Sequence, residues 1–303
     1  MTSPRQLKYL YEKGQNISSF LRHEMNQDHN TREIIEISYD LQTGSYISAM
    51  ENKEMSKHKK EYSKEIARVI LSLCEPKSIL EAGVGEATTL SGVLNNLDNE
   101  LNSYGFDLSW SRVAYANKWL HKEGISRTVL CTGDLFHIPF LDDSIDVVYT
   151  SHSIEPNGGS EKPILRELYR VARKFLILLE PGYELANDKA KERMDVHGYC
   201  KNLKGISKSL GYNVLEHRLF PYTSNLENPT AITIIRKDGV GDIEISSDVL
   251  ACPKYKTPLN NIGGMLFSPE ALAVYPTVGG IHCLRIENGI FASKYEEVMK
   301  DYS

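Results

Sequence analysis

Carboxylates placed beside a glycine turn are the residues in this chain whose types and spacing best suit chemistry. Residues 78–90 read SILEAGVGEATTL, in which an apolar run leads through Glu81 and Ala82 to Gly83 and Gly85. Glycine lacks a Cβ, so such a turn can take unusual φ values and let a ligand approach the backbone closely. A carboxylate two residues before the first glycine repels a phosphate but suits a ligand that carries positive charge. The stretch therefore predicts a binding turn for a cationic ligand.

The spacing of the glycines excludes one common alternative. A dinucleotide fingerprint, G-x-G-x-x-G, needs a third glycine, and Thr88 stands at that position. S-adenosylmethionine carries both an ammonium and a sulfonium, so it meets the requirement set by Glu81. The E-x-G-x-G sequence resembles the first motif of class I methyltransferases that use this cofactor.

A second acid follows at the end of the next expected strand. Asp107 closes the strand at 103–107, Leu108 leads from it into a helix, and both belong to the expected cofactor site. Asp107 lies 24 residues after Gly83, near the spacing of an acid that accepts hydrogen bonds from ribose hydroxyls. A simple helix cap is the alternative role for this residue.

A third acid begins the most specific part of the resemblance. Residues 133–148, GDLFHIPFLDDSIDVV, resemble the segment between the third and fourth strands in the small-molecule branch of the family. The resemblance implies that Asp134 meets the adenine amino group and that the Leu135 amide meets the ring. An amine donates and a carboxylate accepts, which agrees with this role. Phe136 and Ile138 are candidates to pack on the base, with core packing as the alternative.

The segment after the fourth expected strand should face the transferred methyl group, because open α/β sheets bind ligands beyond the carboxyl ends of their strands. Ser151 belongs to the expected cofactor site, and His152 and Glu155 are the candidate general bases. Histidine titrates near neutrality, which suits proton removal. A structural hydrogen bond is the alternative for His152. Pro156 stands where several small-molecule relatives have a histidine.

The acceptor is inferred by exclusion. Neither N-P-P-Y nor D-P-P-Y follows the fourth strand, which disfavours amino groups of adenine or glutamine. The formal net charge of −5 argues against a nucleic-acid partner. We expect methyl transfer to an O or N atom of a small molecule, such as a sugar or a nucleotide-linked intermediate of surface-polysaccharide or secondary metabolism. Two alternatives stay open: an RNA or protein methyltransferase with a fused activator module, and a scaffold that binds the cofactor without catalysis.

The elements that must position these residues are strands alternating with helices, and residues 61–240 form the expected methyltransferase domain. The pattern predicts an α/β fold with a doubly wound, Rossmann-like sheet of seven mostly parallel strands. Residues 165–182, LRELYRVARKFLILLEPG, resemble a further family motif, and the resemblance implies that the last strand runs antiparallel. In the helix of this motif we expect Glu167 and Arg170 to face outward.

Residues 1–60 predict a helical cap that closes over the site, with simple padding of the sheet as the alternative. Tyr46 is placed to reach a cofactor carboxylate from this cap. The lysine-rich run at 53–60 predicts a solvated face. No apolar run approaches the ~20 residues of a membrane span, and the N-terminus has no apolar signal core, so we expect a cytoplasmic protein without a membrane partner.

Residues 241–303 form the expected small α+β C-terminal module. Cys252-Pro253 and Tyr275-Pro276 occur in a pattern that resembles the zinc-ribbon-like partner of tRNA and protein methyltransferases. Tyr255 stands where the second metal-binding cysteine of that pattern belongs. A structural zinc ion needs four suitable ligands, so we expect no metal here. The expected role of the module is structural, substrate-lining or an interface.

Overall fold

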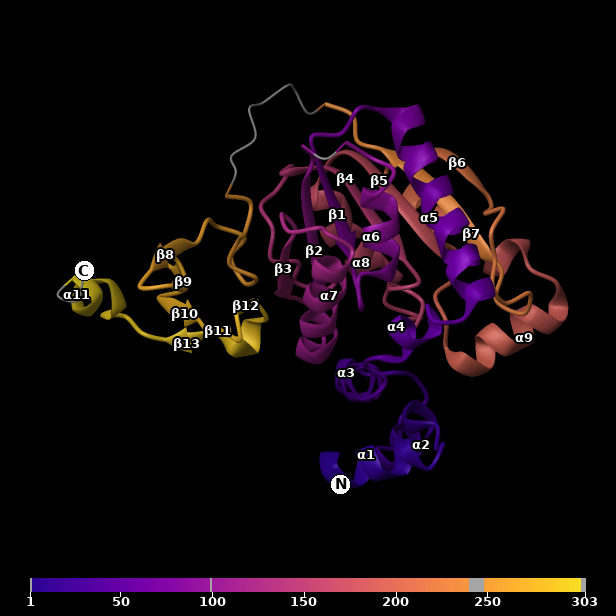
Figure 1. Ribbon diagram of the computed structural model, residues 1–303, viewed down its shortest axis with the longest axis horizontal. Coiled ribbons are helices and arrows are strands. Elements are labelled where there is room, and N and C mark those ends of the chain that lie inside the picture. The colour runs from indigo at the N-terminus through magenta and orange to yellow at the C-terminus, as the bar shows by residue number, and fades with distance from the viewer. Residues whose placement is uncertain (1, 99, 240–247, 301–303) are drawn as a thin grey trace.

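The computed structural model describes residues 2–98, 100–239 and 248–300 of the chain. A central sheet is covered by helices on both faces (Figure 1). Side chains alternate across buried strands, so Ile79 packs in one hydrophobic core and Leu80 in the other. Both side chains are fully buried. This three-layer arrangement confirms the expected α/β fold.

Nine strands from the described part of the chain form the main sheet. They are β1 (Ser78–Ala82), β2 (Asn102–Asp107), β3 (Val129–Thr132), β4 (Ile145–Ser151), β5 (Ala172–Pro181), β6 (Asn213–Leu219), β7 (Thr230–Arg236), β11 (Thr277–Val278) and β12 (Ile281–Cys283). Their order is β11-β12-β3-β2-β1-β4-β5-β7-β6. The neighbours from β3 to β5 pair in parallel, whereas β7 runs antiparallel to β5 and β6, as expected.

The seven strands expected for residues 61–240 are present, and the C-terminal residues extend the sheet by two more. Strand β12 pairs in parallel with β3, with His282 opposite Cys131, and β11 pairs antiparallel with β12. Beyond this pairing, the Leu284 amide donates to the Thr132 carbonyl at 3.2 Å. The tail is thus joined by main-chain hydrogen bonds to the edge of the expected domain.

Helices supply the outer layers, and none in the described part of the chain is long and apolar enough to cross a membrane. They are α1 (Pro4–Glu12), α2 (Ile17–Glu24), α3 (Arg32–Leu41), α4 (Ser45–Ala49), α5 (Lys53–Leu73), α6 (Thr88–Leu94), α7 (Trp110–Lys122), α8 (Glu161–Val171), α9 (Asp188–His197), α10 (Leu203–Ser209) and α11 (Tyr295–Lys300). Residues of α5, α6 and α7 share one core, and residues of α8 and α10 share the other.

The first three helices pack around a core of their own. Each begins at a polar residue whose side chain accepts a backbone hydrogen bond, as helix N-termini require. Helix α5 runs unbroken across residue 60, where the expected cap and domain meet. The buried residues of the cap core are Leu7, Ile17, Leu21 and Ile34.

The C-terminal module also forms a second sheet, of four antiparallel strands within the described residues, in the order β13-β10-β9-β8. Val249, Cys252 and Leu266 of the module belong to the same hydrophobic core as α8. The module is therefore packed against the main domain. The strands of its own sheet are β8 (Asn260–Ile262), β9 (Met265–Ser268), β10 (Ala273–Tyr275) and β13 (Ile290–Phe291).

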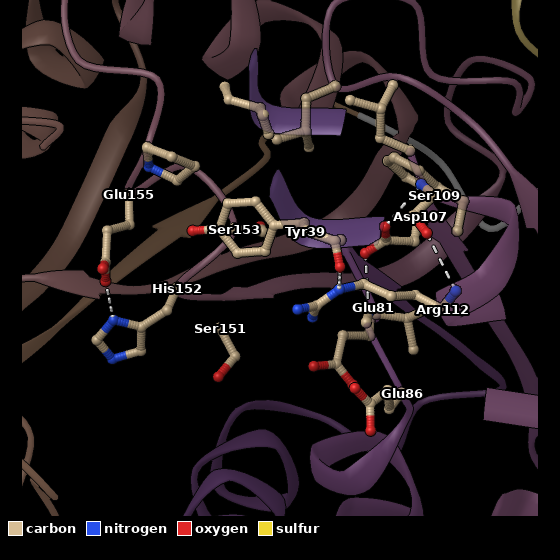
Figure 2. A pocket seen from close by; sticks show the side chains of 18 of the residues that line it. Tyr39, Glu81, Glu86, Asp107, Ser109, Arg112, Ser151, His152, Ser153 and Glu155 are labelled. Atoms are coloured by element: carbon tan, nitrogen blue, oxygen red, sulfur yellow. Dashed lines mark hydrogen bonds and ion pairs between the residues drawn. The ribbon is translucent and has the colours of Figure 1, made fainter. Parts of the chain in front are cut away.

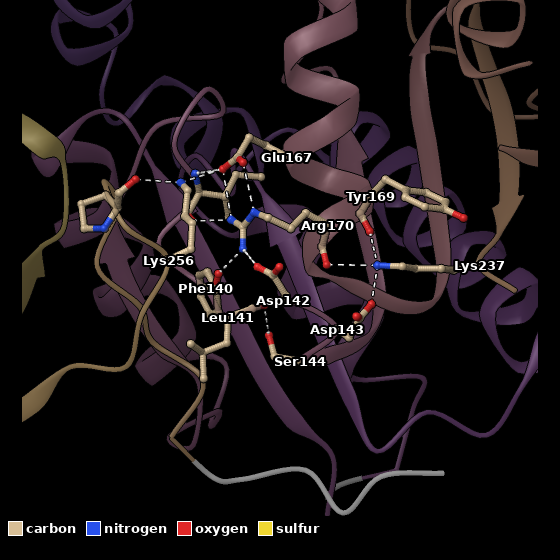
Figure 3. Close-up of polar contacts among 12 residues, drawn as sticks. Phe140, Leu141, Asp142, Asp143, Ser144, Glu167, Tyr169, Arg170, Lys237 and Lys256 are labelled. Atoms are coloured by element: carbon tan, nitrogen blue, oxygen red, sulfur yellow. Dashed lines mark hydrogen bonds and ion pairs between the residues drawn. The ribbon is translucent and has the colours of Figure 1, made fainter. Parts of the chain in front are cut away.

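Figure 3 shows a polar anchor between α8 and the module. Lys256 Nζ lies 2.8 Å from Glu167 Oε2, and Arg170 Nη1 donates to the Phe140 carbonyl at 2.7 Å. The side chains of Glu167 and Arg170 are 17% and 16% exposed, so the expectation that they face outward was wrong. An amphipathic helix pattern cannot show that a distant segment covers its polar side.

Candidate active site

A cavity of about 330 Å³ lies at the carboxyl ends of β1, β2 and β4. Residues of α3, α4 and α5 form part of its wall. Figure 2 shows Glu81, Asp107 and Ser151 from the strand ends around the same space as Tyr39 from the cap. Open α/β sheets bind ligands at this edge, and the volume is in the range of small-molecule sites.

The turn after β1 requires glycine at its first position. Gly83 has φ +75°, and a Cβ built there would lie 2.2 Å from the Cβ of Ser153. Gly85 also has a positive φ, +52°. The amides of Gly83 and Val84 donate to the Phe106 carbonyl at 2.9 and 2.8 Å, which fixes the turn against β2. Bare backbone thus forms part of the cavity floor.

Asp107 holds that turn from the end of β2. Its Oδ2 accepts from the Gly85 amide at 2.9 Å, and its Oδ1 accepts from the Ser109 amide at 2.9 Å. The side chain that caps α7 belongs to Ser109, which accepts from the Arg112 amide, so a helix cap does not explain Asp107. Burial raises the pKa of Asp107.

Asp134 lies beyond β3 and is bonded to the cap. Its Oδ1 accepts from the Phe136 amide at 2.9 Å, and its Oδ2 accepts from Arg32 Nη1 at 2.5 Å. Its side chain is 7% exposed. Leu135 and Phe136 line the same part of the cavity. Ile138 is fully buried in the core, so of the two candidates to pack on a base only Phe136 lines the cavity.

Opposite charges converge at the end of β1. Glu81 is 2% exposed, and the Tyr149 hydroxyl donates to its Oε2 at 3.0 Å. Lys59 of α5 lines the same cavity and donates from Nζ to Thr89 Oγ1 at 2.8 Å. Burial raises the pKa of Glu81 and lowers that of Lys59, while their mutual attraction opposes both shifts. The expected solvated face at 53–60 was therefore wrong for Lys59, because the helix turns this residue inward.

Arg112 joins the cap to α7. Its guanidinium lies 4.9 Å from the ring centres of both Tyr39 and Tyr46, and its Nε donates to the Tyr39 carbonyl at 2.8 Å. Figure 2 shows the Arg112–Tyr39 bond beside Asp107. Burial raises the pKa of the Tyr39 hydroxyl, which keeps it neutral. Sequence reasoning missed Arg112 and Tyr39, since a helical arginine usually faces water.

His152 and Glu155 form a hydrogen-bonded pair after β4. His152 has φ +57°, an uncommon backbone state for a residue with a Cβ. Its Nδ1 is bonded to Glu155 Oε2, and its Nε2 lies 2.8 Å from Thr230 Oγ1. Burial lowers the pKa of His152, but the Glu155 carboxylate outweighs burial, so the pKa is raised. The pair thus favours a protonated imidazole.

Glu180 supports this loop from the end of β5. It accepts hydrogen bonds from the amides of Ser153, Ile154 and Glu155 at 3.1, 3.1 and 3.0 Å. The residue is 1% exposed, and burial raises its pKa to about 7. Sequence reasoning missed Glu180, although its place at the carboxyl end of the neighbouring strand was a usable signal. Its carboxyl group holds the backbone that presents His152.

The wall beside the pair of His152 and Glu155 comes from the loop between β6 and β7. Ser224, Asn225 and Asn228 line the cavity from this loop. Asn228 Nδ2 donates to Glu155 Oε2 at 3.2 Å. Asn228 Oδ1 and Ser153 Oγ are buried and have no hydrogen-bond partner among the described residues. No sequence motif indicated the loop.

Most of the site residues expected from the sequence come together. Ala82 is the exception. Its methyl group is fully buried on the face of the sheet that packs in the same hydrophobic core as α8, so it does not line the cavity. Ser151 Oγ lies 3.0 Å from the Tyr62 hydroxyl. The expected residues that line the cavity are Tyr46, Glu81, Gly83, Gly85, Asp107, Leu108, Asp134, Leu135, Ser151, His152 and Glu155.

The chain is similar to known methyltransferases in part of its sequence and in its fold. Residues 79–174 match a family model described as a methyltransferase domain. Magnesium protoporphyrin IX methyltransferase from Synechocystis, solved with bound SAH, is 13% identical, with 69% of this chain and 100% of that chain covered and a TM-score of 0.53. A putative O-methyltransferase from Nostoc punctiforme is 15% identical, with 66% and 60% covered and a TM-score of 0.51. At these identities the likeness shows the shared fold.

The matched domain and the strand order support a class I methyltransferase. Its cofactor is S-adenosylmethionine. The cavity fits this group, since the glycine turn admits a ligand against the backbone and opposite charges at Glu81 and Lys59 match an amino-acid zwitterion. The family match ends at residue 174 and does not extend to the C-terminal module.

Proposed function

We propose that the protein transfers the methyl group of S-adenosylmethionine to an O or N atom of a small, hydroxyl-rich molecule in the cytoplasm. A sugar or a nucleotide-linked intermediate is the favoured acceptor. The observation that carries this proposal is the carboxamide of Asn228, a residue of the cavity wall, which donates to Glu155 and whose Oδ1 is buried without a hydrogen-bond partner among the described residues. An unpartnered acceptor atom favours a ligand that brings an O–H or N–H group.

The proposed cofactor contacts follow the strands in order. Glu81 receives the ammonium and Lys59 the carboxylate of the methionine end, which Tyr46 also approaches. Asp107 receives the ribose hydroxyls. Asp134 receives the adenine amine. The burial of Glu81 and Asp134 supports these roles, because a carboxylate removed from water gains most from a partner that carries donors.

The cofactor supplies a methyl group on a sulfonium, which is a good leaving group, so the chain contributes mainly orientation and proton removal. His152 Nε2 accepts the proton of the acceptor, and Glu155 fixes the imidazole through Nδ1. Nε2 is bonded to Thr230 in this structure, so the acceptor hydroxyl must replace that partner. The Glu155 carboxylate then stabilises the imidazolium that forms.

The wall opposite the cofactor residues favours a neutral acceptor. Asn157, Ser224, Asn225 and Asn228 present amide and hydroxyl groups without formal charge. Such groups pair with hydroxyls in either direction, as donor or as acceptor. A sugar offers several hydroxyls at once, which is why it is favoured over an aliphatic acceptor.

The experiment that tests this function offers the protein methyl-labelled cofactor with panels of sugars, nucleotide-linked sugars and small amines. We expect one of these acceptors to gain the labelled methyl group at O or N, and His152→Ala to form this product far more slowly. Label found in RNA in a salt-sensitive reaction would favour the fused-activator alternative instead. Binding of SAH by calorimetry without transfer to any acceptor would favour the scaffold alternative.

A further inference from the structure

Helix α3 forms one wall of the cofactor cavity and carries a stripe of polar residues. Arg32, Glu36 and Asp40 recur at every fourth position, so they lie on one face of the helix. Arg32 bonds to Asp134 beyond β3, and Asp40 accepts from Ser109 Oγ at 2.7 Å at the start of α7. The two ends of the stripe therefore bond to different edges of the cavity.

The middle residue of the stripe is bonded to the C-terminal module. Both oxygens of Glu36 accept hydrogen bonds from Arg285, with Nη2 at 2.8 Å from Oε2. Arg285 Nη1 also donates to the Leu108 carbonyl at 3.4 Å, and both Glu36 and Leu108 line the cavity. The Arg285 side chain is 15% exposed. A two-bond contact between a guanidinium and a carboxylate is among the stronger polar contacts in proteins.

The main chain that carries Arg285 is hydrogen-bonded to the edge of the main sheet. Arg285 follows β12, whose pairing with β3 continues through the Leu284 amide to the Thr132 carbonyl. On another side the module is held to α8 by Lys256 and Glu167, as Figure 3 shows. Because the main chain before Arg285 is bonded to β3 and the chain after it pairs within the module through β13 and β10, the guanidinium can hold α3 in place instead of moving with it.

We propose that Arg285 is a positioning residue for the cofactor, and that the C-terminal module contributes to cofactor retention through it. Asp134 is the acid proposed for the adenine, so the bond between Arg32 and Asp134 competes with the bound cofactor. The bond between Glu36 and Arg285 uses neither of these groups and persists when the cofactor is bound. It keeps α3 over the cavity and fixes Leu108 at its edge.

The test measures SAH binding and involves no acceptor, so an error in the proposed acceptor leaves it unaffected. Arg285→Met should bind SAH about tenfold more weakly by calorimetry, with the loss mainly in the dissociation rate. Arg285→Lys should be intermediate, because an ammonium cannot form the two-bond contact. Wild-type affinity in Arg285→Met would overturn the proposal.

A double-mutant cycle separates this role from a merely structural one. Glu36→Gln should weaken binding about as much as Arg285→Met, and the double variant should be no weaker than either single variant. Additive losses would mean that the two residues act separately and would overturn the proposal. Glu287→Gln is the control, since Glu287 bonds the same guanidinium from within the module, and it should bind SAH normally. Should Arg285→Met fail to fold, normal SAH binding by Glu36→Gln would overturn the proposal.

Discussion

The cofactor half and the acceptor half of the cavity are built in different ways. The cofactor half takes Glu81, Asp107 and Asp134 from the ends of three adjacent strands, each beside its own turn. The acceptor half joins His152 and Glu155 to Thr230 and Asn228, which lie more than 70 residues further along the chain. The first half is local in sequence, and the second exists only after the sheet has formed.

The two halves also differ in their electrostatics. Glu81 and Asp107 have raised pKa values because burial is the dominant cause, and a cationic or hydroxyl-bearing ligand would relieve that cost. Glu155 is buried too, but His152 offsets burial and lowers its pKa. Glu81 and Asp107 therefore gain from a ligand that carries donors or positive charge, whereas Glu155 already has its cationic partner in His152. Variants in the cofactor half should consequently change SAH binding, and variants in the acceptor half should change turnover.

The largest effect is expected in the acceptor half. His152→Ala should lower turnover by about 10²–10⁴-fold, the usual contribution of a general base, while the dissociation constant for SAH stays close to that of the wild type. Single-turnover kinetics with saturating cofactor would measure this. A variant with the full rate would remove His152 as the base and leave it a structural role.

Asp107→Ala should cost ~1–3 kcal/mol in SAH binding, because ribose hydroxyls and the Gly85 amide lose their acceptor. Isothermal titration calorimetry measures the loss directly. Asp98→Ala is the matched control, since Asp98 accepts from the Glu100 amide but is exposed and does not line the cavity. Equal affinities for Asp107→Ala and the wild type would exclude Asp107 from the site.

Lys59→Met should weaken SAH binding by ~1 kcal/mol and leave 5′-methylthioadenosine binding unchanged, because the latter has no amino-acid end. Lys60→Met changes the neighbouring exposed lysine and should affect neither ligand. Competition binding with both ligands gives the comparison. An equal loss for the two ligands would show that Lys59 acts on the fold of the cavity and not on the carboxylate.

The smallest effect concerns the pH dependence of turnover. A base must be neutral to accept a proton, so turnover should rise with pH through the pKa of His152, which lies above its ordinary value. Glu155→Gln removes the carboxylate that stabilises the imidazolium and leaves burial, which lowers the pKa. The midpoint of the pH–rate curve should therefore move to lower pH. An unmoved midpoint would assign the titration to another group.

Several expectations failed for a common reason. Lys59, Glu167 and Arg170 each belong to a polar helix face, and the sequence pattern predicts water around all three. The structure surrounds them with segments from elsewhere: the cavity wall for Lys59, the C-terminal module for Glu167, and the loop after β3 for Arg170. Helical periodicity reports which side of a helix is polar, but it carries no information about what packs against that side.

The sequence by itself determined the α/β class, the order of the elements and the acids of the cofactor half. Each of these depends on residues that are close in the chain, such as Glu81 beside Gly83 or Asp107 at the end of its strand. Only the tertiary structure decided that Arg285 reaches Glu36, that Glu180 holds the loop of His152, and that β12 extends the sheet. These contacts join residues that are 25 or more positions apart, where pairing is set by the packing of whole elements and leaves no local pattern.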